Sequence, residues 1–174
     1  MTVTAPQHRT SLWATSTTAR AHPSIRTVRG VADLDAAVAL VGPGLADAAA
    51  TYDAPRGRLL VARVEGRVVG VAGVRRLGAD PRRPDGHVAL IGHLVVAHGH
   101  RGRGVGTGLL GRAMAGGYWL GCDTLRVLVG PAERLVDAAR VSSFLERSGF
   151  RVADEDGDLV AERPVAPGSS DRVA

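Results

Sequence analysis

Glycines alternating with basic residues mark the stretch of this sequence best suited to chemistry. It runs from position 98 to 106 and contains His98, Gly99, His100, Arg101, Gly102, Arg103, Gly104, Val105 and Gly106. Glycine lets the backbone adopt a positive φ and approach a ligand closely. Successive N–H groups at the start of a helix form an anion site, because they have no intrahelical partner. The residue types therefore predict a turn that binds phosphate or pyrophosphate, with arginine charge beside it.

The segments on either side of this turn would hold it in place. Val88–Val96 is a nearly continuous apolar run of strand length, which predicts a strand covered on both faces. After the turn, apolar and small residues recur at helical spacing and predict an amphipathic helix over Gly104–Leu120. The turn is thus expected at a junction between a buried strand and a helix.

Other interpretations of the glycines are weaker. Gly106–Gly111 fits the G-x-G-x-x-G pattern of dinucleotide sites, but that pattern begins where a strand ends, and here the strand ends near Val96. A Walker A loop needs a lysine, and the chain contains none. A plain glycine-rich loop remains an alternative. The arginine–glycine order and both flanking segments favour the phosphate role.

The segment Arg101–Gly106 resembles the R/Q-x-x-G-x-G/A signature of the GCN5-related N-acetyltransferases (GNAT family). The resemblance implies that Gly104–Leu120 is the third helix of that fold and that the preceding strand is the fourth. It further implies that this strand splays from the fifth and pairs with the pantetheine arm of acetyl-CoA, while the turn binds the pyrophosphate. The cofactor-binding residues it implies are Leu94, Val95, Val96, Arg101, Gly102, Arg103, Gly104, Val105, Gly106 and Thr107.

Composition sets broad limits. A chain of 174 residues predicts one domain, and 45% hydrophobic residues suffice for a sizeable core. All 22 basic residues are arginine, a compositional bias that weakens the net charge of +5 as an argument for a nucleic-acid partner, although it suits an anionic ligand. Cys122 is the sole cysteine and is expected to be structural. No apolar run approaches membrane-spanning length and no signal core is apparent, so we expect a cytoplasmic protein without membrane contact.

The chain divides into a flexible arm over 1–23, one domain over 24–163 and a disordered tail over 164–174. Strands are expected at 24–29, 59–64, 67–74, 88–96, 124–129, 150–153 and 159–163. Helices are expected at 31–41, 45–52, 104–120 and 131–148, and an exposed loop at 77–86. This order, β-αα-βββ-α-β-α-β(β), is the order of the GNAT family. The resemblance implies an α/β (α+β) fold whose mixed, mostly antiparallel sheet of six to seven strands is flanked by about four helices.

The catalytic groups stay unassigned. Aligning Gly149-Phe150 with the end of the family's fourth helix places Leu145 where tyrosine, the general acid, is common, and Ala138 where asparagine is frequent. No carboxylate lies on the central strand. Ser142 is a candidate substitute acid. His93 is a candidate base or relay, because an imidazole exchanges protons near neutral pH, or else a hydrogen-bonded histidine that lines the ligand.

The resemblance thus implies an acetyl-CoA-dependent N-acetyltransferase that acts on a primary amine of a small molecule, peptide or protein, by direct attack in a ternary complex. A module that holds acyl-CoA without turnover is the alternative suggested by Leu145. A basic nucleic-acid binder is the third, but the sequence offers few aromatic platforms. No metal site is expected, because His98 and His100 have no second ligand cluster nearby. A homodimer is left open.

Overall fold

A computed structural model describes residues 22–53, 55–80, 83–129, 131–155 and 158–165. These residues form a seven-stranded sheet in the order β1-β2-β3-β4-β5-β7-β6. The strands are β1 (Ser24–Thr27), β2 (Gly57–Val64), β3 (Arg67–Asp80), β4 (Arg83–Val96), β5 (Thr124–Val129), β6 (Arg151–Glu155) and β7 (Asp158–Pro164). The helices are α1 (Val31–Val41), α2 (Gly44–Ala48), α3 (Val105–Trp119) and α4 (Pro131–Arg147), with 3₁₀ turns η1 (Ala49–Tyr52) and η2 (His98–His100). The predicted element order is confirmed.

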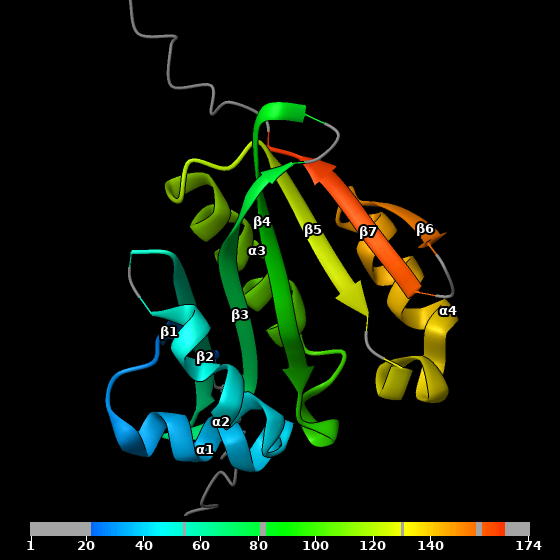
Figure 1. Cartoon of the computed structure of the whole chain (residues 1–174). Coiled ribbons are helices and arrows are strands. Elements are labelled where there is room, and N and C mark those ends of the chain that lie inside the picture. Colours follow the sequence, from blue (N-terminus) through cyan, green and yellow to red (C-terminus); the bar gives the residue numbers. More distant parts are fainter. Residues whose placement is uncertain (1–21, 54, 81–82, 130, 156–157, 166–174) are drawn as a thin grey trace, which may run out of the picture.

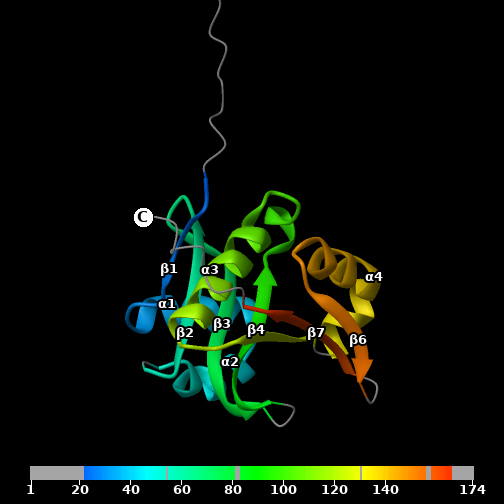
Figure 2. The same cartoon turned by 90° about the horizontal axis from the view of Figure 1, so that it is seen from above.

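The helices lie on both faces of the sheet (Figures 1 and 2). We call the face covered by α1 and α2 the front face, and the face covered by α3 the back face. All neighbouring strands pair antiparallel except β4 and β5, which pair in parallel. The mixed, mostly antiparallel sheet with four α-helices matches the fold class predicted from the sequence.

Strand alternation divides the core into two clusters. Leu60, Val74 and Ile91 point to the back face and pack with α3 residues such as Leu109 and Leu110. On the front face the cluster contains Ala37, Leu45, Tyr52, Leu59, Val61 and Val71. Because both clusters contain residues of β2 and β3, these strands pack against helices on both faces of the sheet.

Asp33 fixes α1 to the first two strands. Its carboxylate is only 2% exposed and accepts hydrogen bonds from the Arg26 and Arg63 guanidinium groups, at 2.9 and 2.5 Å, and from the Arg29 backbone N–H at 2.9 Å. A buried carboxylate is tolerated when it is paired in this way, and removing its partners is costly. The ion-pair cluster thus anchors the front-face helices to the sheet.

The predicted exposed loop at 77–86 is wrong. β3 and β4 continue as an antiparallel pair as far as Asp80 and Arg83. Glycine, proline and charged residues suggested a loop, but backbone pairing depends on the partner strand and extends the hairpin beyond the apolar stretch. The strands predicted at 59–64 and 67–74 are joined by a hairpin turn at Glu65-Gly66, with φ of 49° and 78° at these two residues.

Other boundaries differ by smaller amounts. The expected helix at 45–52 is divided into α2 and η1, and the first strand stops at Thr27. Gly149, which follows α4, has a φ of 83°, the left-handed conformation that often ends a helix. Most of the predicted arm and tail lie outside the described residues, and β7 runs through Pro164.

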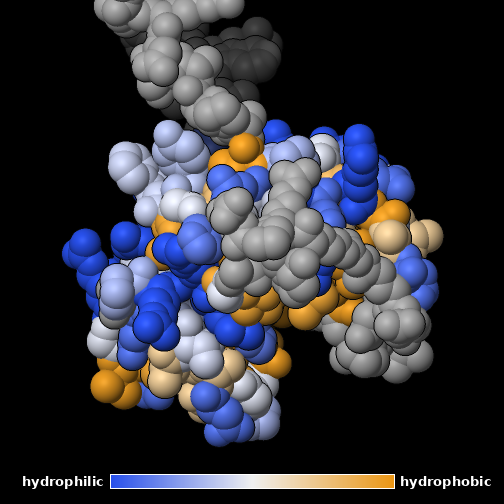
Figure 3. All heavy atoms as spheres, turned by 45° about the horizontal axis from the view of Figure 1, so that its top comes forward, coloured by the Kyte–Doolittle hydropathy of each residue, from blue (hydrophilic) through white to orange (hydrophobic). Residues whose placement is uncertain are grey.

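Cys122 is buried, as expected of a structural residue. Among the described residues, no helix has the length and apolar character needed to cross a bilayer. On the surface seen in Figure 3, strongly hydrophilic residues cover much of the described area, and hydrophobic residues form smaller groups between them.

Candidate functional site

β4 and β5 run side by side over four residue pairs and then separate. Val88–Ile91 pair with Thr124–Val127, and Figure 1 shows the two strands diverging beyond that point. Residues 88–91 are buried, whereas residues 92–96 are half-buried because the partner strand has moved away. The predicted cover on both faces therefore holds only for the first half of the apolar run. Its second half borders an opening in the sheet.

A β-bulge at His93 coincides with this parting. Val71 pairs with Val95 and Gly73 with Gly92, so β4 carries one more residue than β3 between these pairs. His93 has a φ of 51°, which is unusual for a residue other than glycine. Bulges bend a strand and redirect side chains. The sequence candidate His93 thus lies where the sheet opens, half-buried and presented by distorted backbone.

Tyr52 is the neighbour of this bulge that the sequence did not predict. The tyrosine is 6% exposed, and its ring contacts the His93 ring edge-on, with centroids 5.8 Å apart. The ring lies over Gly73, where an added Cβ would come within 2.3 Å of it, and its hydroxyl approaches Gly92. Paired glycines inside two neighbouring strands were the signal that a large group comes close.

The protonation of Tyr52 follows from its burial. Desolvation raises the pKa of the phenol above its ordinary value, and the nearby Arg75 charge offsets part of this rise. The hydroxyl therefore stays protonated at neutral pH and can donate a hydrogen bond.

The glycine turn leads into α3 without a side-chain cap from any described residue. Gly102 and Gly104 adopt φ of 69° and 80°, and α3 begins at Val105. The hydrogen bond from the Gly108 N–H to the Gly104 carbonyl, at 2.9 Å, is that of the first full turn. The preceding amides of Val105, Gly106 and Thr107 are consequently orphan donors at the positive end of the helix dipole.

The turn is packed against the end of β4. The Arg101 Nε donates to the Val96 carbonyl at 3.0 Å, so part of this guanidinium group holds the loop to the strand. A Cβ added at Gly106 would lie 3.6 Å from Val96 Cγ2. The ten residues predicted to bind the cofactor, in 94–96 and 101–107, therefore come together beside the opening between β4 and β5.

The fourth helix contributes no visible acid at the position that the sequence alignment indicated. Leu145 is 1% exposed and belongs to the back-face core. Ser142 is half-buried one turn earlier, and the side chain of Ala138 lies outside the described residues. No group of three metal-ligating side chains occurs in the described part of the chain.

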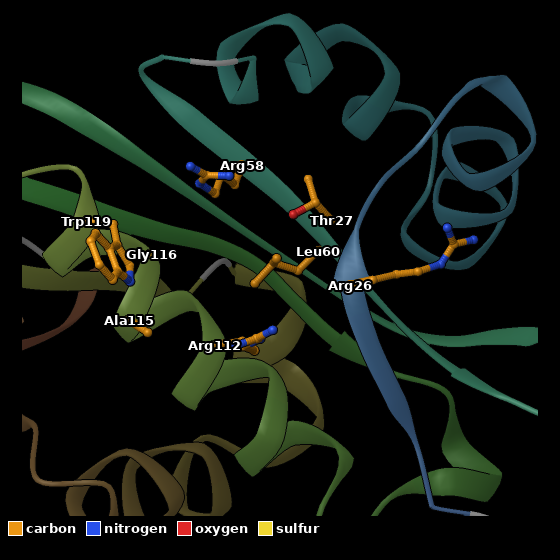
Figure 4. A pocket seen from close by; sticks show the side chains of 8 residues that line it. All are labelled: Arg26, Thr27, Arg58, Leu60, Arg112, Ala115, Gly116 and Trp119. Atoms are coloured by element: carbon orange, nitrogen blue, oxygen red, sulfur yellow. The ribbon is translucent and has the colours of Figure 1, made fainter.

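Two arginine-lined pockets lie on opposite faces of the sheet. The front pocket, of about 400 Å³, is lined by residues that include Thr51, Asp53, Pro55, Arg56, Arg75 and Arg76. The back pocket, of about 290 Å³, is lined by residues that include Thr27, Arg58, Leu60, Arg112, Gly116 and Trp119. In Figure 4, Arg26 points away from the back pocket, in agreement with its bond to Asp33.

Comparisons with known proteins agree with this geometry. Residues 55–152 match the model of an acetyltransferase (GNAT) domain. No curated protein matches the chain. An acetyltransferase of the GNAT family from Staphylococcus aureus Mu50 superposes with a TM-score of 0.65 at 16% identity, over 83% of this chain and 100% of that one. An aminoglycoside 6'-N-acetyltransferase complexed with coenzyme A gives 0.64 at 15% identity, over 83% and 98%. An acetyltransferase from Streptococcus agalactiae 2603 gives 0.63 at 16% identity, over 82% and 98%.

Proposed function

Because its match to the GNAT domain model covers more than half of its length, the chain belongs to the GNAT acetyltransferase family, and we propose that it transfers an acetyl group from acetyl-CoA to a primary amine. The observation that carries this proposal is the position of the orphan amides of α3 beside the place where β4 and β5 separate. A solved structure of similar fold is complexed with coenzyme A, which supports the same ligand class here.

The residues of the turn fit the pyrophosphate of the coenzyme. The amides of Val105, Gly106 and Thr107 would donate to its oxygens, and the exposed Arg103 would add charge. An added Cβ at Gly102 or Gly104 would meet nothing within 4 Å, so the backbone is open to a ligand there. Leu94, Val95 and Val96 offer the strand edge left by β5 to the amide groups of the pantetheine arm.

The bulge would position the reacting groups. The coenzyme supplies an acetyl thioester: the amine nitrogen bonds to its carbonyl carbon, the carbon–sulfur bond breaks, and sulfur leaves with the electron pair. His93 would accept the proton that the amine loses, directly or through water. Tyr52 would hold the imidazole ring in place. The thiolate takes its proton from solvent, because Leu145 has none to give.

A coenzyme-binding module without turnover is the second candidate. The burial of Leu145 at 1% exposure favours it, because that position of α4 then offers no acid for the leaving thiolate. Steady release of thiol with a physiological amine would exclude this candidate. Binding of acetyl-CoA without release under any amine would favour it.

Titration with acetyl-CoA in a calorimeter tests the binding site. Gly106→Glu places a carboxylate at the orphan amides, and we expect affinity to fall at least about 100-fold through repulsion and lost hydrogen bonds. Gly106→Ala has room for its methyl group, with the nearest atom at 3.6 Å, and should retain most of the affinity.

Gly111→Glu is the matched control, because it adds the same charge to the same helix at an exposed, open position. Its affinity should equal that of the wild type. If Gly106→Glu and Gly111→Glu bind acetyl-CoA equally well, the turn is not the site.

A further inference from the structure

A row of paired residues crosses the front face next to the bulge. Arg75 on β3 lies opposite Leu90 on β4, Leu90 opposite Arg126 on β5, and Arg126 opposite Glu162 on β7. Two guanidinium groups therefore flank the strand that carries the reaction centre. The row is three residues before His93, which corresponds to roughly 10 Å along a strand.

Alternation along each strand sets the direction of these side chains. Val74, Ile91 and Val127 belong to the back-face core. Their neighbours Arg75, Leu90 and Arg126 therefore belong to the front face. This is also the face on which Tyr52 and η1 lie.

The two arginines are in different electrostatic states. The Arg126 Nε donates to the Glu162 carboxylate at 2.7 Å, and a second nitrogen of the group bonds the same oxygen, so this charge is balanced. No ion pair joins Arg75 to an acidic side chain in the described part of the chain. Arg75 is half-buried, which strengthens its attraction for an anion.

Arg75 also borders the front pocket, and that pocket is positively charged. Arg56 and Arg75 contribute two guanidinium groups against the single carboxylate of Asp53, whereas Arg76 borders the pocket but its charge acts on Cys122 in the back-face core. The loop is fixed to the sheet by the hydrogen bond from the Arg76 N–H to the Arg56 carbonyl, at 2.8 Å. Thr51 and Asp53 are the sequence neighbours of Tyr52, and the Arg75 charge that borders the pocket also acts on the Tyr52 phenol, whose ring contacts His93.

We propose that the acceptor is a small primary amine that carries an anionic group, either carboxylate or phosphate, bound by Arg75 with Arg56 while its nitrogen lies at His93. The inference depends on the proposed acetyl transfer, whose acceptor class it names. A guanidinium group binds such oxyanions through parallel N–H donors, which fixes orientation as well as charge. An acceptor without the anion leaves these donors unpaired and is disfavoured.

Pairs of acceptors that differ in the anion alone provide the test. Thiol release is measured with each common amino acid against its amide, and with O-phosphoethanolamine against ethanolamine. We expect the anionic member of at least one pair to have a kcat/KM roughly 10- to 100-fold higher. The carboxylate and phosphate arms distinguish the two anions.

Arg75→Ala should raise KM for the preferred anionic acceptor by roughly 10- to 100-fold and change kcat little, because the arginine binds the distant end of the substrate. KM for the neutral member should stay unchanged. Arg75→Lys should restore part of the preference, since a lysine keeps the charge but not the paired donors.

Arg58→Ala is the control. Arg58 pairs with Val74 on the neighbouring strand and lines the back pocket, so the variant removes an equal charge from the other face. Its kinetics should equal those of the wild type. Failure of acetyl-CoA to bind would remove the proposed function itself.

If acetyl-CoA binds normally and neutral and anionic amines are turned over equally well, the proposed acceptor class is wrong while the proposed acetyl transfer stands. If no amine is turned over, binding of the paired amines to the protein with acetyl-CoA bound is measured by calorimetry. Binding of the anionic member that weakens in Arg75→Ala would support the class, and absence of binding would overturn it.

Discussion

The front and back pockets have similar linings but different surroundings. Both are hollows of a few hundred Å³ bordered by arginines, and both lie at the β2 side of the sheet. The front pocket adjoins Tyr52, which is buried against the bulge at His93. The back pocket is bordered by Trp119, which is 79% exposed and whose ring contacts the Tyr118 ring edge-on.

The difference indicates that positive charge in a hollow does not by itself locate a site in this arginine-rich chain. What distinguishes the front pocket is convergence, because distorted backbone, a protonated phenol and the separation of β4 from β5 occur within one region. The back pocket does combine charge with an aromatic side chain, the pairing whose absence argued against nucleic-acid binding. However, the exposed rings of Trp119 and Tyr118 meet edge-on, whereas proteins that bind single-stranded nucleic acid offer ring faces on which successive bases stack.

Replacing the bulge histidine should have the largest effect. His93→Ala should lower the rate by about 100- to 10,000-fold near pH 6.5, a loss typical of a missing base. The deficit should shrink as pH rises, because the amine then loses its own proton. The measurement is the pH–rate profile at saturating acetyl-CoA, with His22→Ala, an exposed histidine far from the bulge in sequence, as the control. A profile parallel to the wild type would remove His93 as the base.

Glycine-to-alanine changes on the two faces should give the next largest effect, a difference in kcat/KM. Gly73→Ala places a methyl carbon 2.3 Å from the Tyr52 ring, whereas Gly116→Ala places one 2.9 Å from Val74 Cγ1. Displacing Tyr52 should lower kcat/KM by about 100-fold and cost about 1–3 kcal/mol of unfolding free energy.

Gly116→Ala should keep normal kinetics, and the better helix propensity of alanine, about 1 kcal/mol, should offset much of its strain. Thiol-release assays and denaturant unfolding measure both quantities. Equal effects of the two variants on kcat/KM would mean that the faces do not differ in function.

The smallest expected effect concerns the protonation of Tyr52. Because burial raises its pKa, the folded state holds the phenol proton more tightly than the unfolded chain does. The tighter hold on this proton contributes to the unfolding free energy in full below the ordinary pKa of 10.0. The contribution is lost as the pH rises through the raised pKa of the folded state. Tyr52→Phe should therefore lose less stability than the wild type between pH 9.5 and 11 in denaturant unfolding. Parallel curves would mean that the phenol ionises equally in both states.

Much of this arrangement was predictable because it depends on local pattern. The bounds of α1 and β5 follow from apolar spacing and from the breakers beside them. The glycine turn was found because positive φ and close backbone approach require that residue type.

The bulge and its neighbour were not predictable. The positive φ at His93 could not be predicted from the residue type, because it results from the register between β3 and β4. Tyr52 ends a short 3₁₀ turn, and only the folded chain brings it over Gly73. The extension of β3 and β4 was missed for the same reason, because pairing between distant residues overrides local composition.

The four-pair seam between β4 and β5 also affects how the molecule responds to load. On either side of it, β1–β4 and β5–β7 are each complete antiparallel units. Helix α3 contacts strands of both units and so connects them across the seam. The two units can therefore move relative to each other at the seam without breaking hydrogen bonds inside either unit. A ligand that lies between the separated ends of β4 and β5 would connect the units a second time.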